Sequence, residues 1–588
     1  MSWRDTGAGE IRTEQVGKTV ALAGWVARRR DHGGLIFIDL RDHTGIGQLV
    51  INPERAPDAA ATAHDIRNEF VLRAKGEVVA RAPDAINPKL PTGEVEVQVD
   101  ELEVISSSTP LPFQLDEQNV DENLRLRYRW LDLRREQMQR NLRLSGAVIS
   151  AIRRRMEELG FVDYWTPSLI KGTPEGARDF LVPVRLQPGK FFVLAQSPQV
   201  YKQLFVIGGF DRYYQIATCW RDEDLRADRQ FEFRQLDVEL AFAEREDVLN
   251  VLEEAVVASF EAVGREPPER PFPRLAWHEA MARYGTDKPD LRYGLEIEDA
   301  TEVTRGSEFG VFANAESVRF LAVPQAFSRA ELERLEEVAK EWGAKGMAYL
   351  VVDETGEVRS PIAKFLSEEE LQAFRTDPGS TVLFAADTPA VTARVLGALR
   401  THLGRELDLA DKSKQALLWV IDFPLFEWNE DEGRWTFSHH PFTGVKPGYE
   451  DLIESDPGAA ISQAYDLVWN GWELGSGSIR IHDQDVQKRV FRALGLSEEE
   501  AEEKFGFLLE ALRMGAPPHG GFAMGIDRFV ALMAGEPNIR EIVGYPKVAS
   551  GSDPLTGAPT PMPDQVLAEL GLQVRPRRGT EENGPRAS

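Results

Sequence analysis

The chain has 588 residues, of which 42% are hydrophobic and 28% are charged, and it contains one cysteine, Cys219. This composition is typical of a folded globular protein and excludes large-scale disorder, while a single cysteine excludes an internal disulfide and any zinc site that needs two thiolates. No apolar run is long enough to cross a bilayer and the N-terminus lacks a signal-peptide pattern, so we expect a soluble cytoplasmic protein. The formal net charge of −27 opposes nucleic-acid binding, so any such binding must depend on local arginine clusters.

Residues 1–108 carry five runs of β-branched and apolar residues, separated by turns that contain Gly, Asp or Asn. The first three are Val20–Val26, Leu35–Leu40 and Ile46–Ile51, and the last two fall near residues 70–79 and 95–105. Five short strands in this length predict a small closed barrel, and the OB-fold, which binds oligonucleotides, is a common five-stranded form. A fragment of a β-sandwich has the same periodicity and stays open as an alternative.

From residue 110 onward, helical and strand-like patterns mix. Apolar residues at helical spacing predict a helix over 144–159, with Gly160 in the position that ends a helix. Capping boxes at Ser328–Glu331 and Ser497–Glu500 predict the starts of two more helices. The clearest strand-like runs are Phe191–Leu194 and Tyr213–Ile216. Because no regular βαβ rhythm is present, we predict an α+β fold.

A charged segment, from Arg221 to Gln230, lies between two strand-like runs. A surface hairpin held by salt bridges is one interpretation. Two features favour a nucleotide site instead: a strand-borne Arg221 beside acidic residues, and Phe233 just beyond the loop. The arginine would neutralise phosphate charge and the aromatic ring would stack on a base.

The segment from Cys219 to Asp237 resembles motif 2 of class II aminoacyl-tRNA synthetases, and RDEDLRADRQ within it is similar to the form in bacterial aspartyl enzymes. Gly521–Arg528 (GFAMGIDR) resembles motif 3. Gly160–Pro167 (GFVDYWTP) resembles motif 1, whose proline lies at the dimer interface in this class. With all three motifs in order, and a resemblance that extends from the barrel to about Pro546, the chain is identified as a member of this class. The resemblance implies a homodimer without membrane association.

Four further segments resemble the aspartate site of the aspartyl subfamily. They are the mobile loop Thr173–Asp179, the segment Gln196–Lys202, the segment His439–Phe442 and the segment Gly475–Arg480, where Ser476 replaces a common glycine.

The resemblance also implies six segments: an OB-fold anticodon-binding domain, a hinge, a first catalytic part with an antiparallel sheet, an inserted α+β domain found in bacterial members, a second catalytic part and a C-terminal extension. In that order we expect them at residues 1–108, 109–142, 143–294, 295–415, 416–555 and 556–588.

The implied reaction joins aspartate to tRNA through an aspartyl-adenylate formed from ATP, with transfer to the 3′-hydroxyl of the terminal adenosine. By resemblance, Arg221 holds the α-phosphate, Arg528 contacts the far phosphates or covers the adenine opposite Phe233, and Glu473 with Asp466 holds Mg²⁺, an ion that prefers oxygen ligands. An acid on a helix surface is the alternative for Asp466. The remaining residues expected at the ATP site are Asp222, Glu223, Gln230, Gly525, Ile526 and Asp527.

Selection of aspartate requires recognition of an acidic side chain. By resemblance, Arg480 binds the β-carboxylate with Lys202 beside it. Three residues are expected around the α-amino group, namely Glu175, Gln199 and Asp237. His439 is expected to sense loop closure or to contact the carboxylate, with a purely structural role as the alternative.

The barrel is expected to read the tRNA anticodon through Arg28 and through stacking of bases on Phe37. In bacterial members, histidine at the position of His32 accompanies enzymes that charge both tRNA(Asp) and tRNA(Asn), and Asp84 favours the same interpretation. We therefore expect tRNA(Asp) and tRNA(Asn) as partners, with a strict tRNA(Asp) enzyme as the alternative.

Two kinds of protein compete with an aspartyl enzyme as interpretations of these motifs. An asparaginyl or lysyl synthetase shares the barrel and the motifs, but Arg480 with Lys202 matches neither a neutral nor a cationic side chain. A non-catalytic nucleic-acid-binding relative would be expected to have degenerate motifs, whereas Arg221, Glu473 and Arg528 are all present.

Overall fold

The computed structural model describes residues 3–172, 176–374 and 377–575. The chain divides into two compact units, Met1–Gln139 and Arg140–Ser588, and each is described by itself. None of the helices in these described ranges combines the length and the apolar character that crossing a bilayer requires.

The first unit contains a closed five-stranded barrel, as predicted. Its strands are joined in the order β1 (Thr19–His32), β2 (Leu35–Asp42), β3 (Gly45–Ile51), β5 (Val95–Ser106) and β4 (Val71–Ala80). Alternate residues such as Leu22, Ile38 and Leu49 fill the interior, which is the period-2 pattern that the sequence displays. The alanine-rich helix α1 (Pro57–His64), which was not predicted, packs on this core through Ala59 and Ala63. Two short helices, α2 (Glu122–Arg127) and α3 (Arg129–Asp132), follow the barrel.

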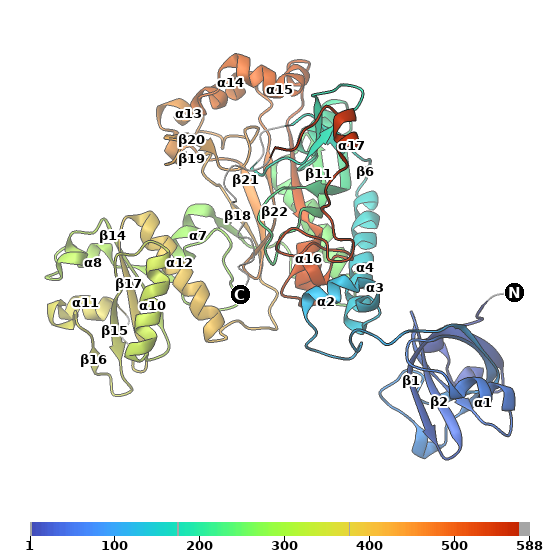
Figure 1. The fold of residues 1–588 in the computed structure, drawn as a ribbon. Coiled ribbons are helices and arrows are strands. Elements are labelled where there is room, and N and C mark those ends of the chain that lie inside the picture. The colour runs from blue at the N-terminus through green and yellow to red at the C-terminus, as the bar shows by residue number, and fades with distance from the viewer. Residues whose placement is uncertain (1–2, 173–175, 375–376, 576–588) are drawn as a thin grey trace, which may run out of the picture. The chain divides into compact units, whose positions relative to one another are not determined.

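The second unit is built on an eight-stranded sheet, and the predicted antiparallel α+β architecture is confirmed (Figure 1). The two edge strands, β12 and β6, are each parallel to their neighbour in the sheet. All other neighbouring strands of the sheet are antiparallel. The order is β12 (Arg274–Ala276), β18 (Leu417–Ile421), β21 (Ala464–Trp469), β22 (Trp472–Ile479), β23 (His519–Gly525), β11 (Glu232–Ala241), β10 (Arg212–Trp220) and β6 (Val162–Asp163).

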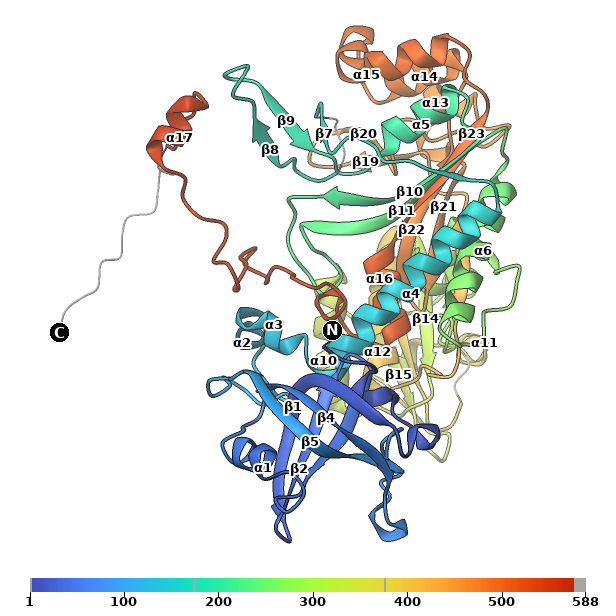
Figure 2. The same cartoon turned by 90° about the vertical axis from the view of Figure 1, so that its right-hand side faces the viewer.

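One face of this sheet is covered by three helices (Figure 2), which are α4 (Glu136–Glu158), α6 (Arg245–Ala262) and α16 (Ile526–Ala534). α4 is the helix predicted over 144–159, and Val148 and Ile152 on it are buried in the common core. It ends as predicted at Gly160, whose φ of 81° is the left-handed conformation that favours glycine. Phe161 N–H donates to Met156 O at 3.0 Å, which completes a Schellman cap.

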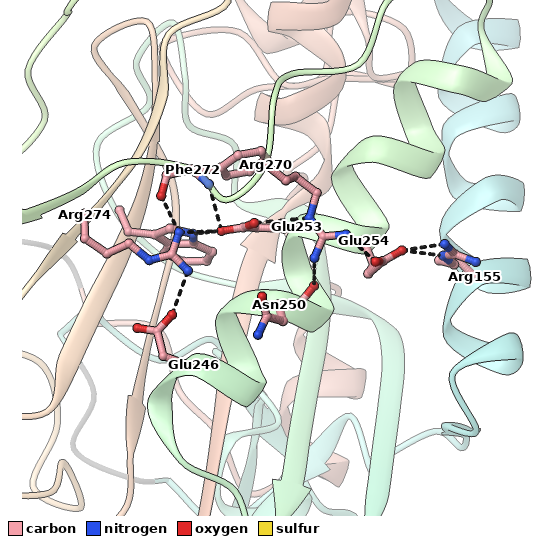
Figure 3. Close-up of polar contacts among 9 residues, drawn as sticks. Arg155, Glu246, Asn250, Glu253, Glu254, Arg270, Phe272 and Arg274 are labelled. Atoms are coloured by element: carbon pink, nitrogen blue, oxygen red, sulfur yellow. Dashed lines mark hydrogen bonds and ion pairs between the residues drawn. The ribbon is translucent and has the colours of Figure 1, made fainter.

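The buried carboxylate of Glu253 on α6 fastens this helix to the edge of the sheet (Figure 3). It accepts from Trp419 Nε1 on β18 at 3.0 Å, from Phe272 N at 3.2 Å and from Arg274 at 2.8 Å. Its neighbour Glu254 pairs with Arg155 of α4, which links α4 to α6. Because a buried charge is tolerated only when it is fully paired, this network holds the helical layer in one position against the sheet.

A second sheet lies between β12 and β18 in the sequence, in the order β13 (Ile297–Asp299), β14 (Ser317–Val323), β17 (Thr381–Asp387), β15 (Ala348–Val352) and β16 (Val358–Arg359). α10 (Arg329–Glu341) and α12 (Pro389–Glu406) cover one face, and α8 (Thr301–Thr304), α9 (Gly310–Ala313) and α11 (Glu368–Ala373) lie near the other. The predicted capping box at the start of α10 is confirmed, since Ser328 and Glu331 exchange both bonds. α7 (Trp277–Tyr284) precedes this sheet and contacts α12.

Smaller elements surround the open face of the large sheet. The strand predicted at Phe191–Leu194 is β9, between β7 (Leu169–Ile170) and β8 (Leu181–Pro183), and β19 (Phe426–Asn429) pairs with β20 (Arg434–Phe437). The predicted capping box at Ser497 begins α15. The remaining helices are α5 (Gln199–Ile207), α13 (Leu452–Ser455), α14 (Gln484–Ala493), α15 (Glu498–Arg513) and α17 (Asp564–Glu569).

Candidate active site

A cavity of about 730 Å³ lies on the face of the large sheet opposite the three helices, and Arg221, Arg480 and Arg528 all line it. Three arginines that are distant in the sequence therefore lie in one cavity. The other predicted residues in its lining are Gln199, Glu223, Gln230, Phe233, Asp237, His439, Glu473, Gly525 and Asp527. Lys202, Asp222, Asp466 and Ile526 are not among the lining residues, and Glu175 falls outside the described residues.

Strand β11 explains how one segment serves both core and cavity. Leu236, Val238 and Leu240 point into the helical layer, whereas Phe233 and Asp237 line the cavity. Successive side chains of a strand face opposite sides, so a strand in this position must alternate apolar and polar residues.

The loop between β10 and β11 carries the predicted nucleotide residues. Arg221 stands one residue beyond β10 rather than within it, and its N–H donates to Phe231 O at 2.9 Å, which continues the ladder. Its guanidinium lies over the ring of Phe233, 5.1 Å from the centroid. This cation and ring form the wall on which a phosphate and a base could both find partners.

Several residues that were predicted to contact the nucleotide instead hold this loop in place. Both ends of the Gln230 amide bond the backbone of Lys547, at 3.0 and 2.7 Å. Asp527 at the start of α16 accepts from Arg234 N–H at 2.9 Å and pairs with its guanidinium. Glu223 pairs with Arg229 at 2.9 Å. These contacts fix the wall but leave fewer free groups for a ligand than the sequence suggested.

Arg528 projects from the first turn of α16 toward the same wall. It donates to Glu473 O at 2.5 Å and pairs with Asp228 at 3.0 Å. Its side chain is 24% exposed, so one wall of the cavity carries a cation that solvent and ligands can reach.

The other end of the cavity is a closed network of buried charges. Arg480 donates two hydrogen bonds to Glu239, at 2.9 and 3.1 Å, and its remaining amino group lies 2.8 Å from Ser478 Oγ and 2.6 Å from His440 Nε2. Lys202 pairs with Asp237 at 3.1 Å and with Glu239 at 3.6 Å. Two cations and two carboxylates thus neutralise one another away from solvent.

The environment moves the pKa values of these groups in different directions. Burial alone would raise the pKa of Glu239, but Arg480 and Lys202 hold it below the usual carboxyl value. For Asp237, burial prevails over Lys202 and raises the pKa. Burial, followed by the nearby charge of Arg480, lowers the pKa of His440 well below its usual value. His440 is therefore a neutral acceptor for the Arg480 guanidinium.

Three buried polar atoms of predicted site residues have no hydrogen-bond partner within the described part of the chain. They are Asp237 Oδ2, Gln199 Nε2 and His439 Nδ1. An unpaired buried polar atom costs about 1–3 kcal/mol, so each is a candidate contact for a polar ligand. Asp237 supplies an acceptor and Gln199 a donor.

Asp466 and Glu473 lie on the neighbouring strands β21 and β22. The alternative of a helix-surface acid for Asp466 is wrong, because it is a buried strand residue that lies 3.3 Å from His439 Nε2. Burial, and then repulsion from Asp466, raises the pKa of Glu473. No group of three or more metal-binding side chains occurs among the described residues. Two carboxylates supply oxygen ligands, the type that fits an ion such as Mg²⁺, which usually keeps several waters.

Glu239 and Lys288 were missed from the sequence, and His440 was given no role of its own although its segment was identified. Glu239 lies two positions after Asp237 on β11, so strand alternation could have found it. His440 adjoins the predicted His439. Lys288, whose Nζ is 3.6 Å from Glu473 Oε2, belongs to no recognised motif and reaches the cavity from a separate loop.

In the barrel, the predicted tRNA contacts Arg28, His32 and Phe37 share one outer face. In the register of β1 and β2, Arg28 lies directly opposite Asp39 and Arg30 lies directly opposite Phe37. His32 precedes the turn at 33–34. Directly opposed residues of an antiparallel pair point to the same side, so these side chains form a continuous surface. Asp84 is exposed in the short helix Pro83–Ala85, on another loop of the barrel.

Comparisons with known proteins agree with this architecture. Residues 121–549 match the family described as tRNA synthetases class II (D, K and N), and residues 20–105 match the OB-fold nucleic acid binding domain. A protein of Geobacillus kaustophilus named aspartate–tRNA ligase is 49% identical over 578 residues, which cover 96% of this chain and 98% of that protein. One from Salinispora arenicola named aspartate–tRNA(Asp/Asn) ligase is 49% identical, with 97% and 96% covered.

Solved structures share the fold at low sequence identity. Asparaginyl-tRNA synthetase from Pyrococcus horikoshii, complexed with asparaginyl-adenylate, is 20% identical with a TM-score of 0.58, and 92% of this chain and 97% of that chain are covered. Aspartyl-tRNA synthetase from Entamoeba histolytica is 20% identical with a TM-score of 0.57, and 92% and 91% are covered.

Proposed function

The chain belongs to the class II tRNA synthetases (D, K and N), and from this premise we propose that it is an aspartate–tRNA ligase. It activates L-aspartate with ATP to aspartyl-adenylate and transfers the aspartyl group to the 3′ end of tRNA. The observation that carries the proposal is the buried pair of Arg480 and Glu239 at the closed end of the cavity.

Arg480 selects the substrate by charge. Its side chain is 1% exposed, so a ligand that meets it does so in surroundings from which solvent is almost excluded. The β-carboxylate of aspartate gains a charge-assisted contact there, whereas the amide of asparagine leaves a buried cation with a weaker partner. Such a loss costs roughly 1–3 kcal/mol, and more for charged groups.

The α-ammonium of aspartate is assigned to Asp237. Its unpartnered Oδ2 is an acceptor that lines the cavity beside the Arg480 network. Gln199 was expected at the same ammonium, but its unpartnered atom is the donor Nε2, which suits a carboxylate oxygen instead. His439, held by Asp466, supplies a further polar group at this end.

Adenylate formation is an in-line attack of the α-carboxylate on the α-phosphorus and needs positioning and charge neutralisation rather than a protein nucleophile. Arg221 neutralises the α-phosphate and Arg528 the far phosphates, while Phe233 stacks on adenine. Asp466 and Glu473 would hold Mg²⁺, which would supply positive charge to neutralise the phosphates.

The test is aspartate-dependent ATP–pyrophosphate exchange by the wild type and by Arg480→Leu. We expect exchange with aspartate among the twenty amino acids, and no detectable exchange with the variant. Glu239 keeps Lys202 at 3.6 Å in the variant, so AMP binding, measured by calorimetry, should persist and report a folded site. Arg489→Leu, which removes a surface pair with Glu454, is the matched control. Normal exchange by Arg480→Leu would refute the assignment.

We propose that the enzyme charges tRNA(Asn) as well as tRNA(Asp). His32 lies at the end of β1 on the exposed barrel face that includes Arg28 and Phe37, and relatives of similar sequence are named aspartate–tRNA(Asp/Asn) ligases. Purified tRNA(Asn) should accept aspartate, and His32→Leu should reduce this charging several-fold more than the charging of tRNA(Asp). Absence of detectable tRNA(Asn) charging would leave the strict enzyme as the function.

We also propose a homodimer, in the cytoplasm where tRNA is charged. Tyr164 and Trp165 are 53% and 69% exposed beside the edge strand β6, an apolar surface that a second copy would cover. Light scattering should give twice the chain mass of 65.9 kDa, and Trp165→Asp should shift it toward one chain.

A further inference from the structure

We propose that Lys288 is a phosphate-binding residue that contacts the β- and γ-phosphates of ATP. The inference rests on the proposed function and adds a residue that none of the three class motifs contains. Lys288 lies in the segment 285–296 that leads from α7 toward β13, here called the entry loop. Its ammonium lines the cavity, 3.6 Å from Glu473 Oε2 and 3.7 Å from Asp287 Oδ1.

The entry loop is fastened on its outer side by Arg400 of α12. This arginine is 1% exposed, and its guanidinium donates to the carbonyl oxygens of Asp290 at 2.8 Å, Gly294 at 3.1 Å and Leu295 at 2.9 Å. A buried guanidinium is stable only when its donors are used, so it ties these carbonyls to one place.

On its inner side the entry loop contacts the strands of the site. A Cβ built at Gly471, in the turn between β21 and β22, would lie 3.2 Å from Asp290 Cβ. Leu291 packs against the core cluster that contains Leu418 and Val468. Gly471 is only two residues before Glu473, so the loop that carries Lys288 and the strand that carries Glu473 are held together.

The ammonium itself is loosely held. Its two carboxylate contacts are longer than the 2.7–3.2 Å of typical hydrogen bonds, and its side chain is 48% exposed. Ion pairs of this kind contribute about 0–1 kcal/mol, so little opposes movement to a stronger anion. Lys202, 1% exposed and tied to two carboxylates, is the contrasting case.

The far phosphates are the best match for this cation. Lys288 and Arg528 both contact Glu473, one through its carboxylate and the other through its carbonyl, and so they share one end of the cavity. A lysine binds phosphate as a flexible point charge beside a more fixed arginine, which suits a pyrophosphate group that must later leave.

The experiment measures binding of ATP, AMP and aspartate by calorimetry for the wild type, Lys288→Met and Lys288→Arg. Methionine keeps the length of the side chain and removes its charge. Lys412→Met, on a lysine that is 73% exposed and paired with Asp408, is the matched control. We expect Lys288→Met to weaken ATP about tenfold or more, as for loss of one charge-assisted contact, with AMP and aspartate within twofold of the wild type. Lys288→Arg should retain most of the affinity.

A kinetic arm separates two sources of phosphate. The KM values for ATP and pyrophosphate should rise in exchange assays without tRNA. If instead only the KM for tRNA rises, in aminoacylation assays, the residue binds the phosphodiester of the tRNA end and the inference is overturned. Equal weakening of ATP and AMP, or no weakening of either, also overturns it. Failure of the proposed function would appear differently, as absence of aspartate-dependent exchange by the wild type, while the binding comparison would still report on Lys288.

Discussion

The cations at the two ends of the cavity differ in how far they are exposed to solvent and in how many partners they have. At the end assigned to aspartate, the side chains of Arg480 and Lys202 are each 1% exposed, and carboxylates of β11 partner both. At the end assigned to the far phosphates, Arg528 is 24% and Lys288 is 48% exposed, and their contacts are fewer. The difference teaches that one site can select an amino acid at a buried end and bind phosphates at an exposed end.

Dielectric environment is the physical basis of that separation. A charge pair interacts several times more strongly at a desolvated site than at a surface, and a wrong ligand leaves a larger penalty. A solvated cation discriminates less, but it can move with a ligand. Fixed buried charges therefore suit recognition of a small acid, and mobile cations suit a triphosphate that is cleaved and released.

The largest expected effect comes from a substitution on β23 that displaces the buried charges at the aspartate end of the cavity. A Cβ at Gly521 on β23 would lie 1.9 Å from Glu239 Oε2 and 2.2 Å from Val238 O, so Gly521→Ala must displace Glu239 and with it Arg480. We expect kcat/KM for aspartate to fall about 100-fold, because displacements near 1 Å have effects of that size. The affinity for ATP should change less than threefold.

Gly146→Ala provides the control for that substitution. No atom lies within 4 Å of a Cβ at this exposed position of α4, so kinetics and stability should be retained. Equal losses for aspartate and ATP in Gly521→Ala would show that the two ends are one mechanical unit, contrary to the comparison.

A second prediction uses pH. Burial raises the pKa of Asp237, so as the pH falls this carboxylate takes up a proton at a higher pH than the ordinary value of about 3.9 and loses its ability to receive an ammonium. Below the raised pKa, the KM for aspartate should increase about tenfold per pH unit. Steady-state kinetics at progressively lower pH would show this limb beginning above the pH at which an ordinary carboxyl group takes up its proton. An aspartate KM that stays constant down to that ordinary value would contradict the prediction.

The smallest predicted effect is that of salt. The Debye length falls from about 10 Å at 0.1 M to about 3 Å at 1 M, and exposed charges are screened much more than buried ones. Raising potassium chloride over this range should increase the KM for ATP a few-fold and change that for aspartate less than twofold. A larger response of aspartate than of ATP would reverse the assignment of the two ends.

Much of this fold was predictable because its signals are local. Alternating strands and turn residues marked the barrel, and the apolar spacing that ends at Gly160 marked α4. Motifs identified Arg221, Arg480 and Arg528, and the structure brings all three to one cavity. The helix α1 was missed because its core contacts come from alanines, which give a weak apolar pattern.

The remaining site residues depend on contacts between distant segments. Nothing near Glu239 in the sequence shows that Arg480, 241 positions away, will pair with it. Lys288 reaches Glu473 only because Arg400 and the turn at Gly471 hold its loop. Asp527 and Gln230 look like ligand contacts in their motifs, but their bonds to Arg234 and Lys547 are visible only in three dimensions.

The guanidinium of Arg400 has a consequence for protein engineering. Excision of the second sheet and its helices, with a short linker in their place, removes no residue of the three motifs. It would also delete α12 and so release the backbone at Asp290 and Leu295. A trimmed enzyme of this kind should be rebuilt with a new anchor for residues 286–292, because the apparently dispensable module serves as scaffolding for its neighbour.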